Sequence, residues 1–311
     1  MNNFTFSQFV FEMKALDALQ FPAYKGSTLR GAFGHAFKRV VCTLRKNSCA
    51  DCLLRQRCVY CYVFETPPPD NAEMMKKYTA APHPFVILPP PEEKRLYKPG
   101  EGFSFCLTLI GKASEYLPYF IYTFNELGKT GIGKDRGTYN LLKVTKADTG
   151  EVVYDGSGKI LHGAYKTVSW EELAGNGKLC QTEELTLRFQ TPTRIRYSED
   201  LVFDLEFHML MRTLLRRISL LSYFHCGSRL DLDFRGLINE AKSIEVKRRS
   251  LKWHDWERYS NRQQTRMKLG GFVGDITFTG EFGKFLPYII LGQHIHVGKG
   301  TSFGLGKYEI Q

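Results

Sequence analysis

Two stretches of the chain match each other without a gap. Residues 107–141 read LTLIGKASEYLPYFIYTFNELGKTGIGKDRGTYNL, and residues 276–310 read ITFTGEFGKFLPYIILGQHIHVGKGTSFGLGKYEI. The alignment pairs YLPYFI with FLPYII and brings the glycines of both loops into register. Each copy predicts a strand that ends at a glycine, a helix with proline in its first turn, a glycine-rich loop and a final strand. The chain therefore contains an internal duplication.

The residues upstream of each copy complete a larger pattern. The second half predicts strands near 184–192 and 243–249, with a long amphipathic helix over 201–226 between them. The first half predicts a corresponding series: a strand near 4–14, a helix over 28–45, and strands near 84–89 and 103–110. Both halves thus have the order βαββαβ, which is the ferredoxin-like pattern.

The predicted fold is therefore α+β, with two ferredoxin-like (RRM-like) halves in tandem. We expect the N-terminal half to cover residues 1–150, with a cysteine-rich insertion at about 42–65. A polar segment rich in Gly, Lys and Asp, residues 151–183, is expected to connect it to the C-terminal half, residues 184–311.

The chain is basic, with 43 Lys and Arg against 32 Asp and Glu and a formal net charge of +11. Lys and Arg gain affinity for phosphates by displacing counterions, so a polyanionic partner is favoured over a merely soluble basic protein. Charge alone does not separate RNA from DNA or from an anionic membrane. No apolar run is long enough to span a bilayer, and the first residues, MNNFTFSQFVFEM, alternate between apolar and polar as a strand does. We therefore expect a cytoplasmic protein that does not bind a membrane.

The glycine-rich loop near the C-terminus is not a mononucleotide site. A P-loop has four residues between its first glycine and its Gly-Lys pair, and it opens a helix. Here five residues separate Gly300 from Gly306, and a strand-like KYEI follows. Two readings stay open: a backbone surface that approaches a sugar–phosphate chain, or a plain turn after a helix.

The helix predicted from STLRGAFGHAFKRVVCTLRK, residues 27–46, has a candidate catalytic histidine. Ser27 or Thr28 is the expected N-cap. The buried stripe comprises Leu29, Ala32, Phe33, Ala36, Phe37, Val40, Val41 and Leu44, and the opposite face Gly31, His35, Lys38, Cys42 and Lys46. An exposed histidine beside positive charge is suited to general base or acid catalysis, although an ordinary surface histidine gives the same pattern. His294 and His296, beside the C-terminal loop, are alternatives.

Five cysteines fall within twenty residues: Cys42, Cys49, Cys52, Cys58 and Cys61. Two CxxC pairs separated by five residues are typical of a metal site, and four thiolates suit zinc or an iron–sulfur cluster. We expect a structural metal that holds the insertion, with free thiols as the alternative. The spacing does not choose between zinc and iron–sulfur.

Several stretches together resemble one family, the CRISPR-associated endoribonucleases that process precursor CRISPR RNA, in the RAMP superfamily. They are YKGSTLRGAFGHAFKRVVC (24–42), CVYCYVFE (58–65), HPFVILPPP (83–91), GKTGIGKDRGTYNLLKV (128–144), FQTPTRIRY (189–197), RYSNRQQTRMKLGGFVGDITFTG (258–280) and HVGKGTSFGLGKY (296–308). The resemblance covers nearly the whole chain and rests on the order and spacing of these pieces.

The resemblance implies an endoribonuclease that cleaves repeat RNA without a metal, with the RNA backbone in a basic cleft between two ferredoxin-like halves. The ribose 2′-OH attacks the adjacent phosphate and leaves a 2′,3′-cyclic phosphate and a 5′-OH. The family's general base or acid carries over to His35, with Tyr24 as its orienter and Lys38 as charge stabiliser.

The resemblance also implies partners and RNA-binding positions. The partners are CRISPR repeat RNA and subunits of a CRISPR effector complex, for a monomer or a homodimer. The expected RNA contacts are Lys25, Arg30, Arg39, Arg194, Arg196, Arg258, Arg262, Lys268, His296, Gly298, Lys299, Gly300, Gly304 and Gly306. Two other functions stay open: a non-catalytic RAMP subunit that binds guide RNA, and a metal-dependent nuclease that uses the cysteine cluster.

Overall fold

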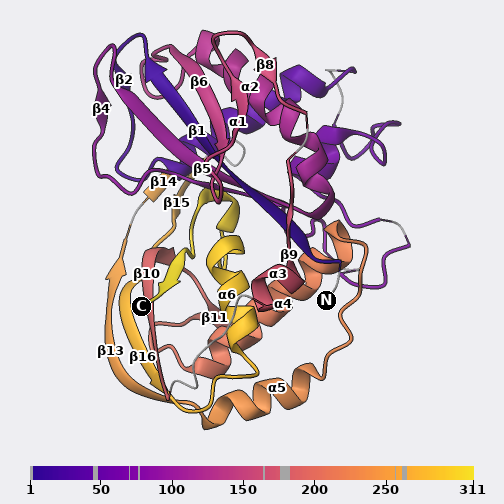
Figure 1. Cartoon of the computed structure of the whole chain (residues 1–311), viewed down its shortest axis with the longest axis vertical. Helices are drawn as coiled ribbons and strands as arrows, with labels where there is room; N and C mark the ends of the chain where they lie inside the picture. The colour runs from indigo at the N-terminus through magenta and orange to yellow at the C-terminus, as the bar shows by residue number, and fades with distance from the viewer. Residues whose placement is uncertain are drawn as a thin grey trace. The chain divides into compact units, whose positions relative to one another are not determined.

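A computed structural model describes residues 3–44, 48–69, 71–75, 78–163, 165–175, 183–255, 257–260 and 265–311. The chain forms two compact units, and we describe each by itself (Figure 1). The N-terminal unit comprises Thr5–Thr167 and Phe224–Cys226. The C-terminal unit comprises Val168–Tyr223 and Gly227–Gln311, together with Met1–Phe4.

The N-terminal unit has a ferredoxin-like core. In chain order its main elements are β1 (Thr5–Ala15), α1 (Gly26–Val41), β3 (Phe85–Leu88), β5 (Gly102–Ile110), α2 (Leu117–Thr130) and β6 (Tyr139–Lys146). The sheet order is β3-β5-β1-β6, and these neighbours pair antiparallel. The smaller elements are β2 (Leu19–Gln20), which pairs with β4 (Leu96–Tyr97), the π-helical turn Cys61–Glu65 and the 3₁₀ turn Gly111–Tyr116.

The sheet of the N-terminal unit continues past β6 into the segment expected to connect the halves. Strands β7 (Val152–Asp155) and β8 (Ile160–Leu161) add to the edge of β6 by antiparallel pairing. The side chains of Val153 and Tyr154 are buried, at 2% and 7% exposure, which explains why this polar stretch is part of the unit.

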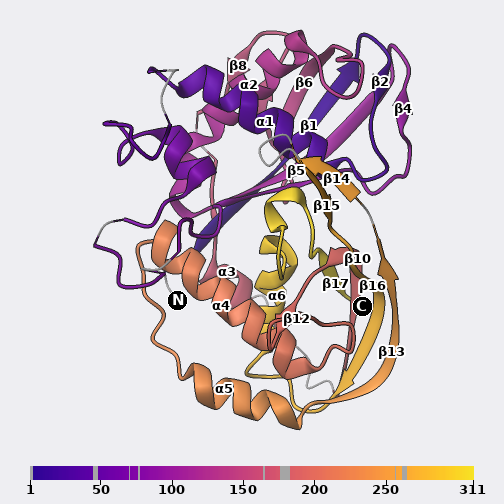
Figure 2. The ribbon, with the colours of Figure 1, turned by 180° about the vertical axis from the view of Figure 1, so that it is seen from behind.

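The C-terminal unit repeats the same order of elements. They are β10 (Glu184–Thr193), α4 (Phe207–His225), β13 (Glu245–His254), β16 (Gly271–Thr279), α6 (Leu286–Ile295) and β17 (Tyr308–Ile310). The sheet order is β13-β16-β10-β17, which matches that of the first unit, so the predicted tandem of ferredoxin-like halves is confirmed. In Figure 2, α4 and α6 lie on one side of this sheet, and β13 is its outer strand.

Several short elements surround these sheets. They are β9 (Val168–Ser169), α3 (Trp170–Gly175), β11 (Arg196–Tyr197), β12 (Asp200–Leu201), α5 (Phe234–Glu240), the 3₁₀ turns Ala241–Ser243 and Thr301–Phe303, β14 (Glu257–Ser260) and β15 (Thr265–Lys268). Both duplicated helices, α2 and α6, have proline in the first turn, as predicted.

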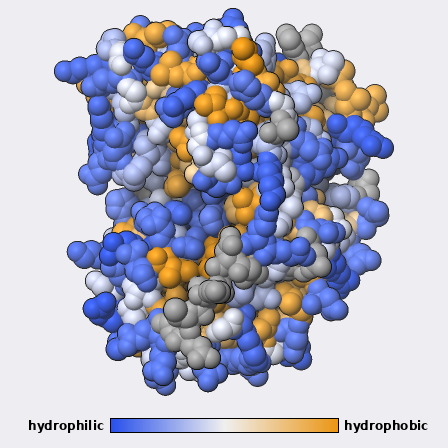
Figure 3. Space-filling model, in the orientation of Figure 1, coloured by the Kyte–Doolittle hydropathy of each residue, from blue (hydrophilic) through white to orange (hydrophobic). Residues whose placement is uncertain are grey.

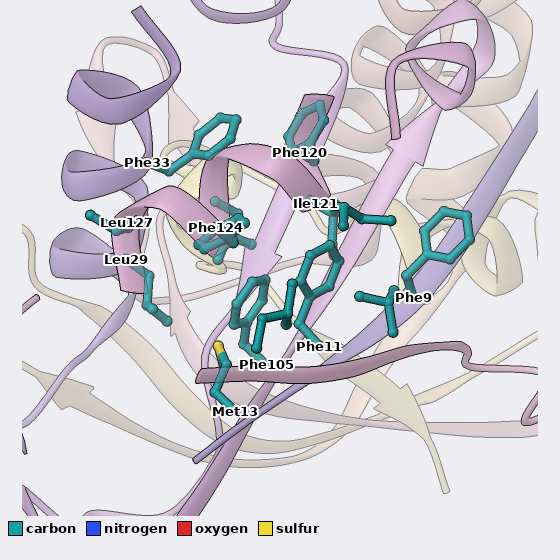
Figure 4. Packing of buried hydrophobic residues seen from close by; sticks show 14 of the residues in the cluster. Phe9, Phe11, Met13, Leu29, Phe33, Phe105, Phe120, Ile121, Phe124 and Leu127 are labelled. Atoms are coloured by element: carbon teal, nitrogen blue, oxygen red, sulfur yellow. The ribbon is translucent and has the colours of Figure 1, made fainter. Parts of the chain in front are cut away.

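Stacked aromatic rings fix α1 against α2 (Figure 4). The fully buried ring of Phe33 stacks on Phe37, Phe120 and Phe124, with centroid distances of 4.9, 4.7 and 5.3 Å. Phe11 of β1 in turn lies 5.4 Å from Phe124. Such contacts stabilise beyond the burial of area alone, so the orientation of α1 about its axis is set by Phe33.

The start of α1 differs from the prediction. The helix begins at Gly26, with Lys25 at the N-cap and no side-chain capping hydrogen bond, so the expected cap at Ser27 or Thr28 is wrong. The Lys25 side chain is buried at 2% exposure, and its Nζ donates a hydrogen bond to the carbonyl oxygen of Glu92, 2.6 Å away. Tertiary packing of this residue, rather than a local cap, sets where the helix begins.

Replacing Phe33 should strongly destabilise the N-terminal unit. Phe33→Ala would empty the centre of the ring cluster and lower the free energy of unfolding by about 3–5 kcal/mol. Urea unfolding, followed by circular dichroism, measures this loss. The matched control is Tyr122→Ala on α2, where a 55% exposed ring should cost about 0.5 kcal/mol or less. Equal effects of the two variants would contradict the role assigned to Phe33.

Candidate functional site

The outward face of α1 presents a histidine beside two basic residues. His35 and Arg39 are exposed and Lys38 is partly buried, whereas Leu29, Phe33, Ala36 and Phe37 are buried. The predicted division into two faces is confirmed for these residues, but Leu44, expected in the buried stripe, is 43% exposed and lies beyond the last helical residue, Val41. A Cβ added to Gly31, one turn before His35, would meet no atom within 4 Å, so the surface beside the imidazole is open.

Lys38 contacts the cysteine-rich insertion through an aromatic ring. Its Nζ lies 5.6 Å from the ring centroid of Tyr60, within the range of a cation–π interaction. The Tyr60 hydroxyl donates to Glu65 Oε1 at 3.3 Å, and burial together with the charge of Glu65 raises the pKa of Tyr60. The phenol therefore stays neutral, and its ring holds the ammonium near the surface of α1.

Gly34 allows the same insertion to lie directly against the helix. A Cβ at this position would collide with the ring of Phe64. The Phe64 ring also carries the guanidinium of Arg30, whose Cζ lies 4.1 Å from the centroid. Glycine lowers the helix propensity of this position, but it allows the insertion to contact the helix closely.

Two basic residues that were predicted to contact RNA have partners within the N-terminal unit. Lys25 is buried with its ammonium on a backbone carbonyl, and burial lowers its pKa. Arg30 lies over Phe64, and its Nη2 is 3.1 Å from His83 Nε2. The buried ammonium of Lys25 is not presented to a phosphate, so that assignment is corrected, whereas Arg30 is half-buried and its RNA contact stays a prediction. Helical spacing did not reveal these partners because they lie far away in sequence.

Tyr24 lies before the first residue of α1, and its role as orienter of His35 stays a prediction. His35 lies in the third turn, about 13 Å along the axis from the start of the helix. Burial raises the pKa of Tyr24, so its phenol stays protonated. The cluster formed on this face is His35 with Lys38 and Arg39, at the i+3 and i+4 positions that share one side of a helix.

The glycine-rich loop between α6 and β17 is closed on itself. Val297 N–H donates to the carbonyl of Gly306, and Gly306 N–H donates to Pro192, at 3.0 and 3.2 Å. Gly306 has φ +78°, and a Cβ there would collide with the carbonyl of Val297. The sister loop has a related closure, from Ile132 N–H to the carbonyl of Gly137 at 2.9 Å. The glycines at these positions therefore serve the loop's own packing, whatever the loop binds.

Gly298 lets this loop pack on the end of β10. Its φ is +86°, and the space of a Cβ is taken by the backbone of Arg194. Lys299 N–H donates to the Arg194 carbonyl at 2.9 Å. The other two predicted loop positions, Gly300 and Gly304, also adopt positive φ, at +77° and +85°.

His296 is a buried structural residue and not a surface contact. Its side chain is 1% exposed, and Nδ1 lies 3.1 Å from the carbonyl oxygen of Leu305. Burial, with a smaller effect of the Lys307 charge, lowers its pKa to about 3. The imidazole is therefore neutral, Nδ1 donates the hydrogen bond, and the predicted role in RNA binding is corrected. His294 is partly buried, and burial lowers its pKa to about 4.

Three predicted cations gather beside the loop: Arg194, Arg196 and Lys299. Burial lowers the pKa of Arg194, and its Nε is buried without a hydrogen-bond partner. The pKa of Lys299 is lowered by partial burial and by the charges of Arg196 and Arg194. Arg196 donates to the backbone carbonyl of Glu199. Mutual repulsion of this kind marks a surface at which an anion would be stabilised.

The remaining predicted RNA contacts lie on the hairpin of β14 and β15. Arg262 lies outside the described residues. Arg258 in β14 and Lys268 in β15 are described only by their backbone, in an antiparallel pair that aligns Arg258 with Met267 and Glu257 with Lys268.

Three cysteines of the insertion lie together. The thiol of Cys61 is buried, and its pKa is raised by burial and by the neighbouring thiols of Cys49 and Cys58, with which it makes side-chain hydrogen bonds. Cys42 is the C-cap of α1, and none of the five takes part in a disulfide. Across the described ranges, however, no group of three or more His, Cys, Asp or Glu side chains is arranged to hold a metal ion.

Within the part of the chain that the structure describes, no helix is long and apolar enough to cross a bilayer. On the face drawn in Figure 3, hydrophilic residues predominate and the hydrophobic residues form small separate patches.

Family models cover most of the chain. The model described as CRISPR-associated endoribonuclease Cas6 matches residues 187–308. A second model, AF_1859_N, described as an N-terminal domain, matches residues 4–165, just over half of the chain. An uncharacterized protein from Archaeoglobus fulgidus is 26% identical over 298 residues, which cover 93% of this chain and 92% of that protein.

Solved structures share the fold. Thermus thermophilus Cas6 has a TM-score of 0.57 and 18% identity, over 99% of both chains. A Cas6 product complex has a TM-score of 0.61 and 19% identity, over 98% of this chain and 100% of the other. A chain of a partial Cas6-RT-Cas1–Cas2 complex has a TM-score of 0.62 and 16% identity, but this chain spans only 46% of its length.

These likenesses agree with the order of elements in the two units. Both sheets have the ferredoxin-like arrangement, and the Cas6 model covers most of the C-terminal unit, including the closed glycine-rich loop. The chain belongs to the family described by the AF_1859_N model, and its residues 187–308 match the family of CRISPR-associated endoribonucleases Cas6.

Proposed function

We propose that this chain binds CRISPR repeat RNA and cleaves precursor CRISPR RNA without a metal ion. The observation that carries the proposal is the exposed His35, with Lys38 and Arg39 beside it, on the outward face of a helix fixed by its buried aromatic rings. A histidine near neutral pH can take up and return a proton, and a fixed cation can stabilise negative charge that develops during a reaction.

In the proposed reaction the ribose 2′-OH attacks the adjacent phosphorus. His35 accepts the 2′-OH proton as the 2′-O–P bond forms, and Lys38 stabilises the charge on the phosphorane oxygens. The bond from phosphorus to the 5′-oxygen breaks, and that oxygen takes up a proton to leave as a 5′-OH. The other product has a 2′,3′-cyclic phosphate. Tyr24, with its raised pKa, remains a protonated phenol, so in this scheme it could contribute as a hydrogen-bond donor but not as a base.

The cationic cluster beside the glycine-rich loop is proposed to bind the RNA backbone. The charges of Arg196 and Arg194 disfavour the charged form of Lys299, so a phosphate would relieve an unfavourable interaction already present in the free protein.

Replacing His35 should abolish cleavage and leave binding. We expect His35→Ala to lower the single-turnover cleavage rate of repeat RNA about 100-fold or more, because general acid–base catalysis contributes 10²–10⁴-fold. Repeat RNA binding should stay within a few-fold, since phosphate contacts dominate affinity. The control is His162→Ala, which removes another exposed imidazole of the same unit. Undiminished cleavage by His35→Ala would exclude His35; binding without cleavage by the natural protein would indicate a non-catalytic RNA-binding subunit.

The chemistry itself can be tested on the substrate. Cleavage should proceed unchanged in EDTA and should yield a 2′,3′-cyclic phosphate and a 5′-OH, identified by end-group analysis. A substrate with a single 2′-deoxy nucleotide at the cleavage position should bind but remain intact, because its nucleophile is missing. Loss of activity in EDTA together with cleavage of the deoxy substrate would instead indicate a metal-dependent nuclease.

We further propose that the cysteines of the insertion hold a structural metal that takes no part in catalysis. The mutual contacts of Cys49, Cys58 and Cys61 support this, as do the two CxxC pairs. The loop between them exposes Leu53 and Leu54, at 96% and 46%, so it has little core of its own. Segments of this kind are commonly held by a metal, and the thiols would close around the ion as it binds.

Metal content tests this second proposal. Elemental analysis of protein purified without oxygen should find about one zinc per chain, or iron with the visible absorption of an iron–sulfur cluster. Cys58→Ser with Cys61→Ser should lose the metal, whereas Cys106→Ser in β5 should keep it. If the protein is folded and active but contains neither zinc nor iron, the cysteines are free thiols and the proposal is wrong.

A further inference from the structure

An exposed aromatic pair lies at the end of β13 in the C-terminal unit. Trp253 and Phe203 are 39% and 40% exposed, and their ring centroids are 6.3 Å apart with a 67° angle between the planes. Phe203 comes from the segment between β12 and α4. In an edge-to-face pair one ring edge covers at most one face of the other ring, so this contact leaves ring faces uncovered.

The indole of Trp253 is held in place although it is exposed. Its Nε1 donates a hydrogen bond to Asp255 Oδ1 at 2.8 Å. Gly270, on the returning side of the same hairpin, makes room for this arrangement: a Cβ there would lie 2.8 Å from Nε1 and would collide with the Asp255 carboxylate. A large ring fixed at the surface loses little freedom when it binds a flat partner.

The pair lies across the sheet from the cationic cluster. Trp253 is the register partner of Phe272 on β16, and Phe272 is the partner of Thr193 on β10. With strands about 4.8 Å apart, the backbone of Trp253 lies about 10 Å from that of Thr193, next to Arg194. Both features belong to the same unit, so their relation does not depend on how the two units are placed.

Two exposed cations lie on the same strand as Trp253, while the carboxylate of Asp255 lies beside the indole itself. Arg248 and Lys252 of β13 are exposed, whereas Lys247 and Arg249 are paired with Glu184 and Asp204. A flat ligand that is also a polyanion fits a stacking surface that shares its unit with the cationic cluster of Arg194, Arg196 and Lys299. An unpaired nucleobase of a single-stranded RNA has both properties, and stacking on an aromatic side chain tolerates any base.

We propose that Trp253 and Phe203 form a platform on which one unpaired nucleobase of the bound RNA stacks. The proposal rests on the proposed function for the RNA itself and adds a contact that the sequence analysis did not identify. The phosphates of the same strand lie on Arg194, Arg196 and Lys299, and the base beyond them is read only as a flat ring. The platform contributes to binding and not to the chemical step.

The first test separates binding from cleavage. For a 2′-deoxy repeat substrate, Trp253→Ala should raise the dissociation constant roughly tenfold, and Trp253→Phe should restore most of the affinity. The single-turnover rate at saturating protein should match the natural chain for Trp253→Ala. The melting temperature is measured for each variant, so that a loss of affinity is compared only between folded proteins. Unchanged affinity with Trp253→Ala in a protein that cleaves repeat RNA would overturn the platform and leave the proposed function intact.

The second test observes the ring directly. With Trp170→Phe and Trp256→Phe, the fluorescence comes from Trp253 alone, and a single-stranded oligouridine should quench it. Inorganic polyphosphate supplies the charge without bases and should not. If oligouridine quenches the fluorescence but the protein does not cleave repeat RNA, the platform is supported and the proposed catalysis is wrong. Absence of quenching by RNA that binds, or equal quenching by polyphosphate, would overturn the platform.

Discussion

The stacking of Phe33 on Phe120 and Phe124 is the contact on which the candidate catalytic face depends. A helix shows its polar residues to solvent only if its apolar stripe is held at one rotation about the axis. The rings of α2 hold α1 in that way, and β1 continues the cluster through Phe11. With this side buried, helical geometry alone directs His35 outward. The chemistry proposed for the surface is thus a consequence of packing on the opposite side.

Much of this arrangement could be predicted from the sequence. In the duplicated stretches, the spacing of apolar residues predicts the strands and helices, and glycine and proline mark where they begin and end. Both units have the predicted order of elements. The two faces of α1 also followed from spacing, because a helix places its residues by a fixed rotation. The boundaries were less well predicted: the helix expected over 201–226 begins only at Phe207, after the short strand β12.

The sequence does not predict which individual basic side chains are buried or what they contact. Lys25, Arg30 and His296 each have partners distant in sequence: the carbonyl of Glu92, the ring of Phe64 with His83, and the closed loop around Leu305. A cation that donates to a buried carbonyl and one that faces water have the same local sequence pattern. The exposed pair of Trp253 and Phe203 was missed for the related reason that its members come from different elements. The family resemblance indicated the right segments but not which side chains within them face outward.

The missing side chain of Gly34 makes the insertion and the helix depend on each other. Glycine in the interior of a helix costs about 1 kcal/mol relative to alanine, and here the space it leaves is filled by Phe64. A descendant that deleted the insertion would keep this cost without the contact, and alanine at position 34 would then be favourable. Selection should therefore retain or discard the two features together, so relatives without the cysteines should tend to lack this glycine.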